Sequence, residues 1–233
     1  MMNILAIDTT GLVASVAIVN EEKTIAEFST DFQKTHSETL MPMIEAVFSL
    51  TGLEMRDMDY LACASGPGSF TGLRIGVATA KGLAFGANKQ ILPVPTLDAM
   101  AYNVGKREGI IAPLMDARRN QAYTAFYRWS GSVMHKIKAE AVLDIQQILQ
   151  ELSLFYEEIT FLGDGVPVFC QAIEASGLSY DFAPPHLNRQ RAAAVGSLAL
   201  RLAGEGRAVW GKDFIPDYLR KSQAERELEE RQK

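Results

Sequence analysis

The sequence predicts a mixed α/β fold with two lobes, because one order of strands and helices occurs twice along the chain. Each half opens with an apolar strand that ends in an aspartate, Asp8 in the first half and Asp116 in the second. Two strands with short turns follow each of them, and helices then alternate with strands. The two halves share this order of elements but no close repeat of residues.

The first half is expected to form an antiparallel meander followed by alternating helices and strands. Its predicted strands are rich in apolar residues and lie at 3–9, 12–20, 23–32, 59–65 and 90–94. A helix begins at the capping box that Thr35 forms with Glu38, and it ends at Gly52. A second helix follows a Gly-rich turn and covers about 70–87.

The second half repeats this pattern. Its predicted strands and helices alternate as before, with strands at 110–117, 121–129, 133–140 and 157–163 and helices at about 144–152, 166–176 and 191–204. Because helices separate the later strands, we expect those strands to be parallel, with right-handed crossovers. This twofold order, a duplicated βββαβα unit around a cleft, is typical of the actin/hexokinase-like fold (the ASKHA, ribonuclease H-like class).

The predicted lobes follow from this duplication. We expect the N-terminal lobe to contain residues 1–106, joined by a C-terminal helix at 191–220, and the second lobe to contain residues 107–190. The segment 221–233 is rich in charge and is expected to be a solvated or frayed helix.

The composition is that of a globular chain, with 233 residues, 48% hydrophobic residues and a net charge of −5. No apolar run approaches the roughly 18 residues that span a bilayer, and no signal-peptide pattern is visible, so we expect a cytoplasmic protein without membrane contact. Cys63 and Cys170 are predicted to be buried free thiols. Because no dense basic patch is visible, we expect contact with nucleic acid to need a partner.

The turn after the first strand carries residues that fit two roles. Asp8 could hold a magnesium ion through water, with the hydroxyls of Thr9 and Thr10 meeting a phosphate. Alternatively, these side chains bond the nearby backbone and Gly11 supplies a positive φ for a simple turn. A nucleotide contact and a turn both stay open here.

Asp116 occupies the matching place in the second half, and it too fits either a nucleotide contact or a turn. Arg118 and Arg119 follow it closely and could bind a phosphate bidentately, or they could pair with the excess carboxylates of the chain. These two arginines are therefore candidates for contact with a phosphate in the cleft.

The densest motif is the Gly-rich segment 66–76, which joins a strand to a helix. Its backbone amides could bind an anion, but it lacks the Lys-Ser or Lys-Thr pair of a P-loop and the Gly-x-Ser-x-Gly of a nucleophile elbow. Small residues recur at every fourth position along this segment and helix, at Gly68, Gly72, Gly76, Ala80 and Ala84. Because each helical Gly costs about 1 kcal/mol relative to Ala, we expect this stripe to allow close approach of another helix, internal or on a partner.

Other catalytic patterns are weak. The histidines, His36, His135 and His186, provide neither an i, i+4 pair nor an HExxH motif, so we predict no metal site and no catalytic residue. The Gly-Asp-Gly triplet at 163–165 fits either a phosphate turn or a tight connection from strand to helix. The chain has no Gly-Gly pair, which actin-type ATPases usually bring to the adenosine.

Six segments spread over nearly the whole chain together resemble the TsaB family, formerly called YeaZ. They are ILAIDTT at 4–10, THSETLMPMIE at 35–45, GPGSFTGLRIG at 66–76, MDARRNQAY at 115–123, GDG at 163–165 and PDYLRK at 216–221. The combination of GPGSFTGLRIG with MDARR is specific to this family. TsaB proteins are partner subunits in making the threonylcarbamoyl modification on an adenosine next to the tRNA anticodon.

The resemblance implies an accessory subunit rather than an enzyme. It implies binding to the catalytic paralogue TsaD with the ATPase TsaE, contact with tRNA only through the complex, and no cofactor of its own, with ATP and Mg at the level of the complex. It also implies a homodimer in isolation, built from the first two long helices. The predicted interface residues are Leu40, Met41, Ile44, Phe48, Gly68, Gly72, Arg74, Gly76 and Ala80.

One departure from the catalytic relative supports this role. TsaD carries a two-histidine metal motif on the helix that corresponds to residues 36–52, whereas Leu40 here stands four residues after His36. Two rival functions stay open, an ATP-dependent small-molecule kinase of the same fold and a peptidase.

Overall fold

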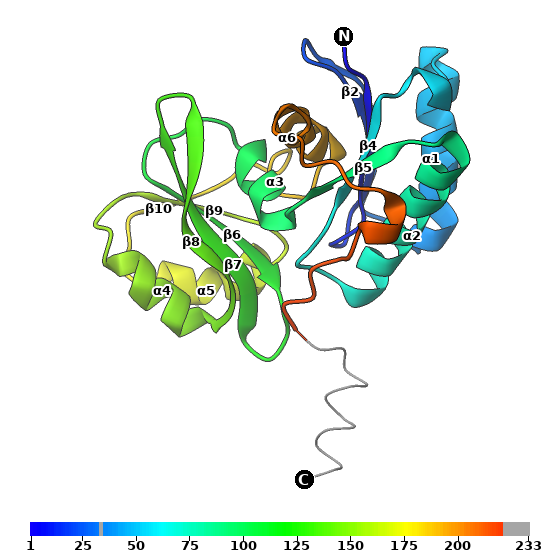
Figure 1. Ribbon diagram of the computed structural model, residues 1–233. Coiled ribbons are helices and arrows are strands. Elements are labelled where there is room, and N and C mark those ends of the chain that lie inside the picture. The colour runs from blue at the N-terminus through cyan, green and yellow to red at the C-terminus, as the bar shows by residue number, and fades with distance from the viewer. Residues whose placement is uncertain (33–34, 221–233) are drawn as a thin grey trace.

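Two five-stranded sheets with the same strand order form the centres of two lobes in the computed structural model, which describes residues 1–32 and 35–220 (Figure 1). The first sheet has the order β3-β2-β1-β4-β5 and consists of β1 (Ile4–Asp8), β2 (Ala14–Val19), β3 (Thr24–Thr30), β4 (Tyr60–Ala64) and β5 (Gln90–Val94). The second has the order β8-β7-β6-β9-β10 and consists of β6 (Ile110–Asp116), β7 (Gln121–Ser130), β8 (Val133–Asp144), β9 (Ile159–Leu162) and β10 (Tyr180–Phe182). In each sheet an antiparallel meander continues into two parallel strands, so the predicted duplication is confirmed.

Helices cover both faces of the first sheet. The helices α1 (His36–Thr51) and α2 (Phe70–Ala87) pack on one face, and α6 (Ala192–Gly204) packs on the other. As predicted, α1 begins at the capping box of Thr35 and ends at Gly52, whose φ of +68° favours glycine. Because both faces are covered, every residue of β1 and β2 is buried.

Helices also cover both faces of the second sheet. The helices α4 (Ile145–Ser153) and α5 (Val166–Glu174) pack on one face, and α3 (Thr96–Asn103) packs on the other. Figure 1 shows α3 and α6 between the two sheets, and these two helices contact each other. They therefore form the inner layer that joins the lobes.

Four elements differ from the sequence predictions. The helix α3 and the strand β10 were not predicted, because eight and three residues carry too little periodicity. The strand β8 continues to Asp144 instead of ending at residue 140. The final helix α6 ends at Gly204, as the range 191–204 predicts, and does not continue to residue 220. The segment after it contains the short helix η2 (Gly211–Asp213), and another short helix, η1 (Met55–Asp57), precedes β4. The predicted tail at 221–233 lies outside the described residues.

The helix α6 ends before Gly206, which adopts a φ of +69°. The segment 205–220 then runs back along the first lobe. Val209 forms a bridge with Ile91 of β5, and Phe214 is buried between α2 and the first sheet. We call residues 205–220 the C-terminal strap.

Both cysteines are free, as predicted, but they differ in burial. Cys63 on β4 lies in the core, whereas Cys170 on α5 is half-buried. The prediction that both thiols are buried was therefore wrong for Cys170, because this residue lies at the edge of the buried face of its helix.

The contact between α6 and the first sheet depends on small residues. An added Cβ at Gly196 would lie 2.5 Å from a methyl group of Val19, whereas a Cβ at Gly204 of the same helix would meet nothing. The strands below α6 present Ala6 and Ala17, which lets the helix approach the sheet.

Replacing Gly196 with Ala should lower the free energy of unfolding by about 1–3 kcal/mol, because the added methyl group overpacks a filled core. Gly204→Ala is the matched control and should be neutral or stabilising by up to about 1 kcal/mol. Urea denaturation of both variants measures the difference. Equal stabilities would contradict the close packing of α6.

Candidate functional site

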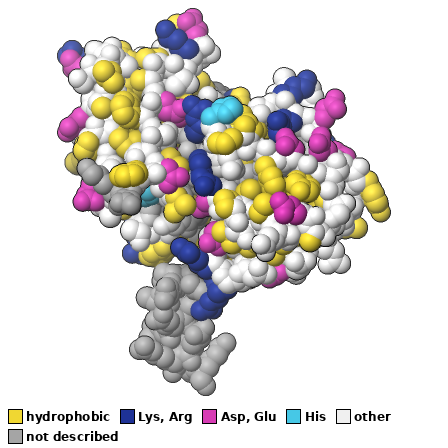
Figure 2. All heavy atoms as spheres, turned by 180° about the vertical axis from the view of Figure 1, so that it is seen from behind, with side chains coloured by type: hydrophobic (Ala, Val, Ile, Leu, Met, Phe, Trp, Pro, Cys, Tyr) yellow, Lys and Arg dark blue, Asp and Glu magenta, His cyan; other side chains and the backbone are white. Residues whose placement is uncertain are grey.

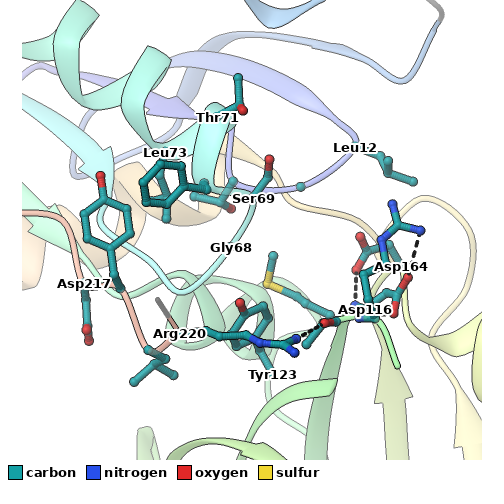
Figure 3. Close-up of a pocket in the computed structure, with 18 of the residues that line it drawn as sticks. Leu12, Gly68, Ser69, Thr71, Leu73, Asp116, Tyr123, Asp164, Asp217 and Arg220 are labelled. Atoms are coloured by element: carbon teal, nitrogen blue, oxygen red, sulfur yellow. Dashed lines mark hydrogen bonds and ion pairs between the residues drawn. The ribbon is translucent and has the colours of Figure 1, made fainter. Parts of the chain in front are cut away.

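A cleft of about 630 Å³ opens between the two lobes (Figure 3). The first lobe contributes the turn after β1, from Thr10 to Leu12, and the start of α2. The second lobe contributes the turn after β6, from Met115 to Arg118, together with Asp164. The strap closes one side with residues 217–220. The two opening strands of the duplicated units therefore both end at this cleft.

Asp8 lies behind the cleft wall and not in it. Its side chain is only 1% exposed, and its Oδ1 accepts hydrogen bonds from the Thr10 amide at 2.9 Å and the Thr10 hydroxyl at 2.7 Å. Its Oδ2 is buried without a hydrogen-bond partner among the described residues. Burial raises the pKa of this carboxyl to about 6, although the bonds from Thr10 and the nearby His36 oppose the rise.

The four residues predicted to contact a nucleotide thus separate into two pairs. Thr10 and Asp116 line the cleft, and their nucleotide contact stays a prediction. Asp8 and Thr9 are buried behind it, and the Thr9 hydroxyl donates to the Gly72 carbonyl at 2.7 Å. In this arrangement Asp8 and Thr9 hold the turn and do not face the cleft.

Two carboxyl groups meet on the second-lobe side of the cleft. The Asp116 amide donates to Asp164 Oδ1 at 3.3 Å, so the Gly-Asp-Gly turn at 163–165 is tied to the end of β6. Burial raises the pKa of Asp164, while the Asp116 amide and Arg189 oppose this rise. The triplet therefore serves as a tight connection between β9 and α5 and also brings a carboxyl group to the cleft.

The turn after Asp116 has an unusual backbone. Arg118, Arg119 and Asn120 have φ angles of +66°, +55° and +61°, a region that residues other than glycine rarely adopt. The Arg118 amide donates to Asp116 Oδ1 at 2.8 Å, and its guanidinium lies 3.7 Å from Asp116 Oδ2. Arg119 is exposed, and no other described residue pairs with its side chain. Sequence patterns gave no indication of this left-handed run.

The strap connects the two lobes across the cleft. The Asp217 amide donates to the Ser65 carbonyl at 2.7 Å in the first lobe, and the ring centroids of Tyr218 and Phe70 lie 4.9 Å apart. Arg220 donates to the Ala117 carbonyl in the second lobe, as Figure 3 shows. Residues 217–220 of the PDYLRK segment, which was noted only for its resemblance to a family, therefore contribute to the site. Lys221 is outside the described residues.

The Gly-rich stripe of α2 faces the interior of its own lobe. An added Cβ at Gly68 would lie 2.5 Å from the Thr10 carbonyl oxygen, and one at Gly72 or Gly76 would overlap Thr9. The partner that approaches so closely is a turn, and not the helix that the spacing predicted. Gly66, with a φ of +117°, lets Asp217 of the strap approach from the other side.

The predicted interface residues consequently divide into two groups. Five of them are buried in their own lobe, namely Leu40, Ile44, Gly72, Gly76 and Ala80, and Gly68 is half-buried where it lines the cleft. Met41 and Arg74 are exposed, and Phe48 is half-buried. The stripe thus packs internally, so in this fold the predicted interface is left to the exposed and half-buried residues and stays a prediction.

His36 connects the first long helix to the site. Its Nε2 lies 2.9 Å from the Gly11 carbonyl oxygen, which ties α1 to the turn after β1. Four residues later, Leu40 is buried in the core. Within residues 1–32 and 35–220, no group of three or more His, Cys, Asp or Glu side chains is arranged to hold a metal ion. None of the helices in this part of the chain is both long and apolar enough to cross a bilayer.

Known proteins are similar to this chain over most or all of its length. A family model described as TsaD, tRNA N6-adenosine threonylcarbamoyltransferase, matches residues 26–228. The tRNA threonylcarbamoyladenosine biosynthesis protein TsaB of Bacillus subtilis is 32% identical, with all of both chains covered. The protein of the same name from Escherichia coli is also 32% identical, over 97% of this chain and 98% of the relative.

The chain belongs to the TsaB family. It is therefore related to proteins of tRNA threonylcarbamoyladenosine biosynthesis, which confirms the resemblance noted from the sequence.

Solved structures agree with this membership. YeaZ from Pseudomonas aeruginosa has a TM-score of 0.78 at 25% identity, covering 94% of this chain and 100% of that one. A second structure from that organism, described as similar to peptidase YEAZ, has a TM-score of 0.79. Component A of (R)-2-hydroxyglutaryl-CoA dehydratase from Acidaminococcus fermentans, at 8% identity and a TM-score of 0.51, shares the fold alone. The actin/hexokinase-like fold is thus confirmed for this member of the TsaB family.

Replacing Asp8 with Asn should stabilise the protein above pH 6. The folded state binds the Asp8 proton more tightly than the unfolded state, because the folded pKa is about 6 against an ordinary value of 3.8. The stability that this group contributes is present below pH 3.8 and is lost as the pH rises through 6. The full difference amounts to about 3 kcal/mol at most.

Urea denaturation from pH 4 to pH 8 measures this effect. The Asp8→Asn variant should lose less stability than the wild type between pH 4 and pH 6.5. Asp213→Asn removes an exposed carboxylate of η2 and serves as the control for the loss of one negative charge. Parallel profiles for all three proteins would contradict the assignment of a destabilised Asp8 carboxylate.

Proposed function

We propose that this member of the TsaB family is a non-catalytic scaffold subunit that binds the catalytic paralogue TsaD, with TsaE, in the threonylcarbamoyl modification of the tRNA adenosine next to the anticodon. Membership in a family named for this biosynthesis supports the process. We place the role in the cytoplasm. The observation that supports docking is an exposed helical face on the first lobe.

The docking face consists of Met41 of α1 together with Ala78, Gly82, Phe85 and Gly86 of α2. The two helices are neighbours on the same side of the first sheet (Figure 1). Phe85 is 91% exposed and Met41 is 41% exposed. An added Cβ at Gly82 or Gly86 would meet no atom of the chain, so the fold itself does not require glycine there.

Two exposed glycines in a helix indicate a surface that another helix approaches. Each costs about 1 kcal/mol relative to Ala, and no internal contact of the lobe offsets this cost. Beside them, an exposed phenylalanine is the kind of aromatic anchor that contributes much of the energy of an interface. We infer that the docking face binds TsaD in the complex and a second copy of this chain when TsaD is absent.

The cleft fits an accessory position in this proposal. We infer no cofactor for the chain alone, with ATP and Mg acting at the level of the complex. Arg118 and Arg119 are the proposed contacts to tRNA or to the cleft. On the face turned away from the first view, Lys and Arg side chains follow the boundary between the lobes (Figure 2), which favours a phosphate backbone passing there once a partner holds it.

The cleft also favours one alternative, an ATP-dependent small-molecule kinase. Thr10 and Asp116 line a cavity of suitable size between two lobes. Such an enzyme needs a magnesium ion near the first strand, and the burial of Asp8 behind the wall opposes this alternative. No feature of the described residues favours a peptidase.

Gly82→Leu should weaken association with TsaD and with a second copy by at least tenfold, because the added side chain holds the two helices apart. The fold should be retained, since the position is open. Gly204→Leu adds the same side chain at an open helical site outside the docking face and should leave association unchanged. Sedimentation velocity and a binding titration with TsaD measure both variants; equal affinities would contradict the docking face.

The subunit role itself is tested by reconstitution with omission. TsaD, TsaE, tRNA, ATP and the activated threonylcarbamoyl donor are combined with and without this chain, and the modified adenosine is quantified. We expect turnover only when the chain is present, and none from the chain alone. Equal turnover in both mixtures would reject the proposal and direct the search to Mg-ATP and small-molecule acceptors in the cleft.

A further inference from the structure

A second cavity, of about 570 Å³, lies between the lobes and shares no lining residue with the cleft. The first lobe contributes the end of β5, the last turns of α6 and the start of the strap. The second lobe contributes β8, and Asp98 of α3 lies between them. Because both lobes supply its walls, the cavity exists only when the two lobes pack together as they do in the folded chain.

Most of the wall is apolar. Val94 and Leu198 are buried, and Met134, Leu202 and Val209 are half-buried around the same space. An apolar cavity of this size with a few polar groups is typical of sites for small organic ligands. The size and the apolar lining do not identify one class of ligand. The charged groups of the wall therefore decide which class fits.

One group of charged residues in and beside the cavity is held by contacts within the chain. Asp98 accepts hydrogen bonds from the Tyr127 hydroxyl and from Lys136 Nζ, both at 2.7 Å. Lys136 Nζ also contacts Glu140 at 2.6 Å. Two carboxylates share one ammonium group in this network, so it has one excess negative charge and offers no free cation to an anionic ligand.

The charges at the rim are not compensated. Arg201 in the last turn of α6 and Arg207 in the strap both line the cavity, and no other described residue forms an ion pair or hydrogen bond with either guanidinium. Glu205, the third charged residue at the rim, is exposed and leaves this group with one excess positive charge. Guanidinium groups bind carboxylates through two parallel hydrogen bonds.

We propose that this cavity binds a small organic carboxylate with an apolar body. Its carboxylate pairs with Arg201 and Arg207, and its body contacts Val94, Leu198 and Val209. The ligand bridges the lobes, so its binding stabilises the folded chain by an amount that rises with the logarithm of its concentration above the dissociation constant. This inference does not depend on the docking face or on the tRNA modification.

The two tryptophans of the chain offer a direct readout. Trp129 pairs with the cavity residue Met134 across the β7–β8 hairpin, and Trp210 follows the cavity residue Val209. Titration with sodium phenylacetate at constant ionic strength should produce a saturable change in tryptophan fluorescence, with a dissociation constant in the millimolar range or tighter. It should also raise the melting temperature.

Two matched ligands and two matched variants decide the assignment. Phenylacetamide, which is neutral, and inorganic phosphate, which lacks an apolar body, should each bind at least tenfold more weakly. The Arg201→Ala, Arg207→Ala double variant should lose at least tenfold in affinity for phenylacetate, whereas Arg56→Ala, an exposed arginine of η1, should not. Equal binding of the amide, equal binding of phosphate, an unchanged double variant or the absence of saturation would each overturn the proposal. The reconstitution assay is separate, so failure here leaves the subunit role intact.

Discussion

The close contact between α2 and the turn after β1 is the constraint on which most of the site depends. Gly68, Gly72 and Gly76 bring the helix backbone against Thr9 and Thr10, with no room for a side chain between them. This contact places the start of α2 in the cleft wall and buries the end of β1 behind it. A carboxyl group that an open turn would expose is thereby held in the interior, where burial raises its pKa.

Three connections then fix the second lobe relative to the first. The chain from β10 into α6 is bound to both lobes, since the Gly163 amide donates to Asn188 Oδ1 at 2.6 Å and the amide of Ala192, the first residue of α6, donates to Ser15 Oγ at 2.9 Å. The inner helices α3 and α6 contact each other, and the strap reaches across through Arg220. Because these connections lie on different sides of the lobe boundary, they leave two separate cavities where side chains do not fill the space.

Much of the fold could be predicted from the sequence, because its signals are local. Short apolar runs predict the strands, and the Thr35 capping box and Gly52 predict the two ends of α1. Each of these signals depends only on neighbouring residues, and the structure has the elements where the sequence indicates. The direction of the α2 stripe could not be predicted in the same way. This helix carries small residues on two sides, one from Gly68 to Ala84 and one from Ala78 to Gly86, and spacing alone does not tell which side meets the sheet. Contacts between distant residues, such as that of the strap with the turn after β6, leave no local pattern at all.

The two sides of α2 illustrate how one composition can serve two purposes. On the inner side, glycine is required, because the turn after β1 occupies the space of a side chain. On the outer side, glycine is unnecessary for the fold and lowers helix stability, so its presence there needs an explanation outside the chain. A surface that lowers the stability of its own helix and exposes Phe85 is explained if a partner covers it, as the proposed function requires. The same argument separates the docking face from the cleft, whose wall residues are held by hydrogen bonds within the chain.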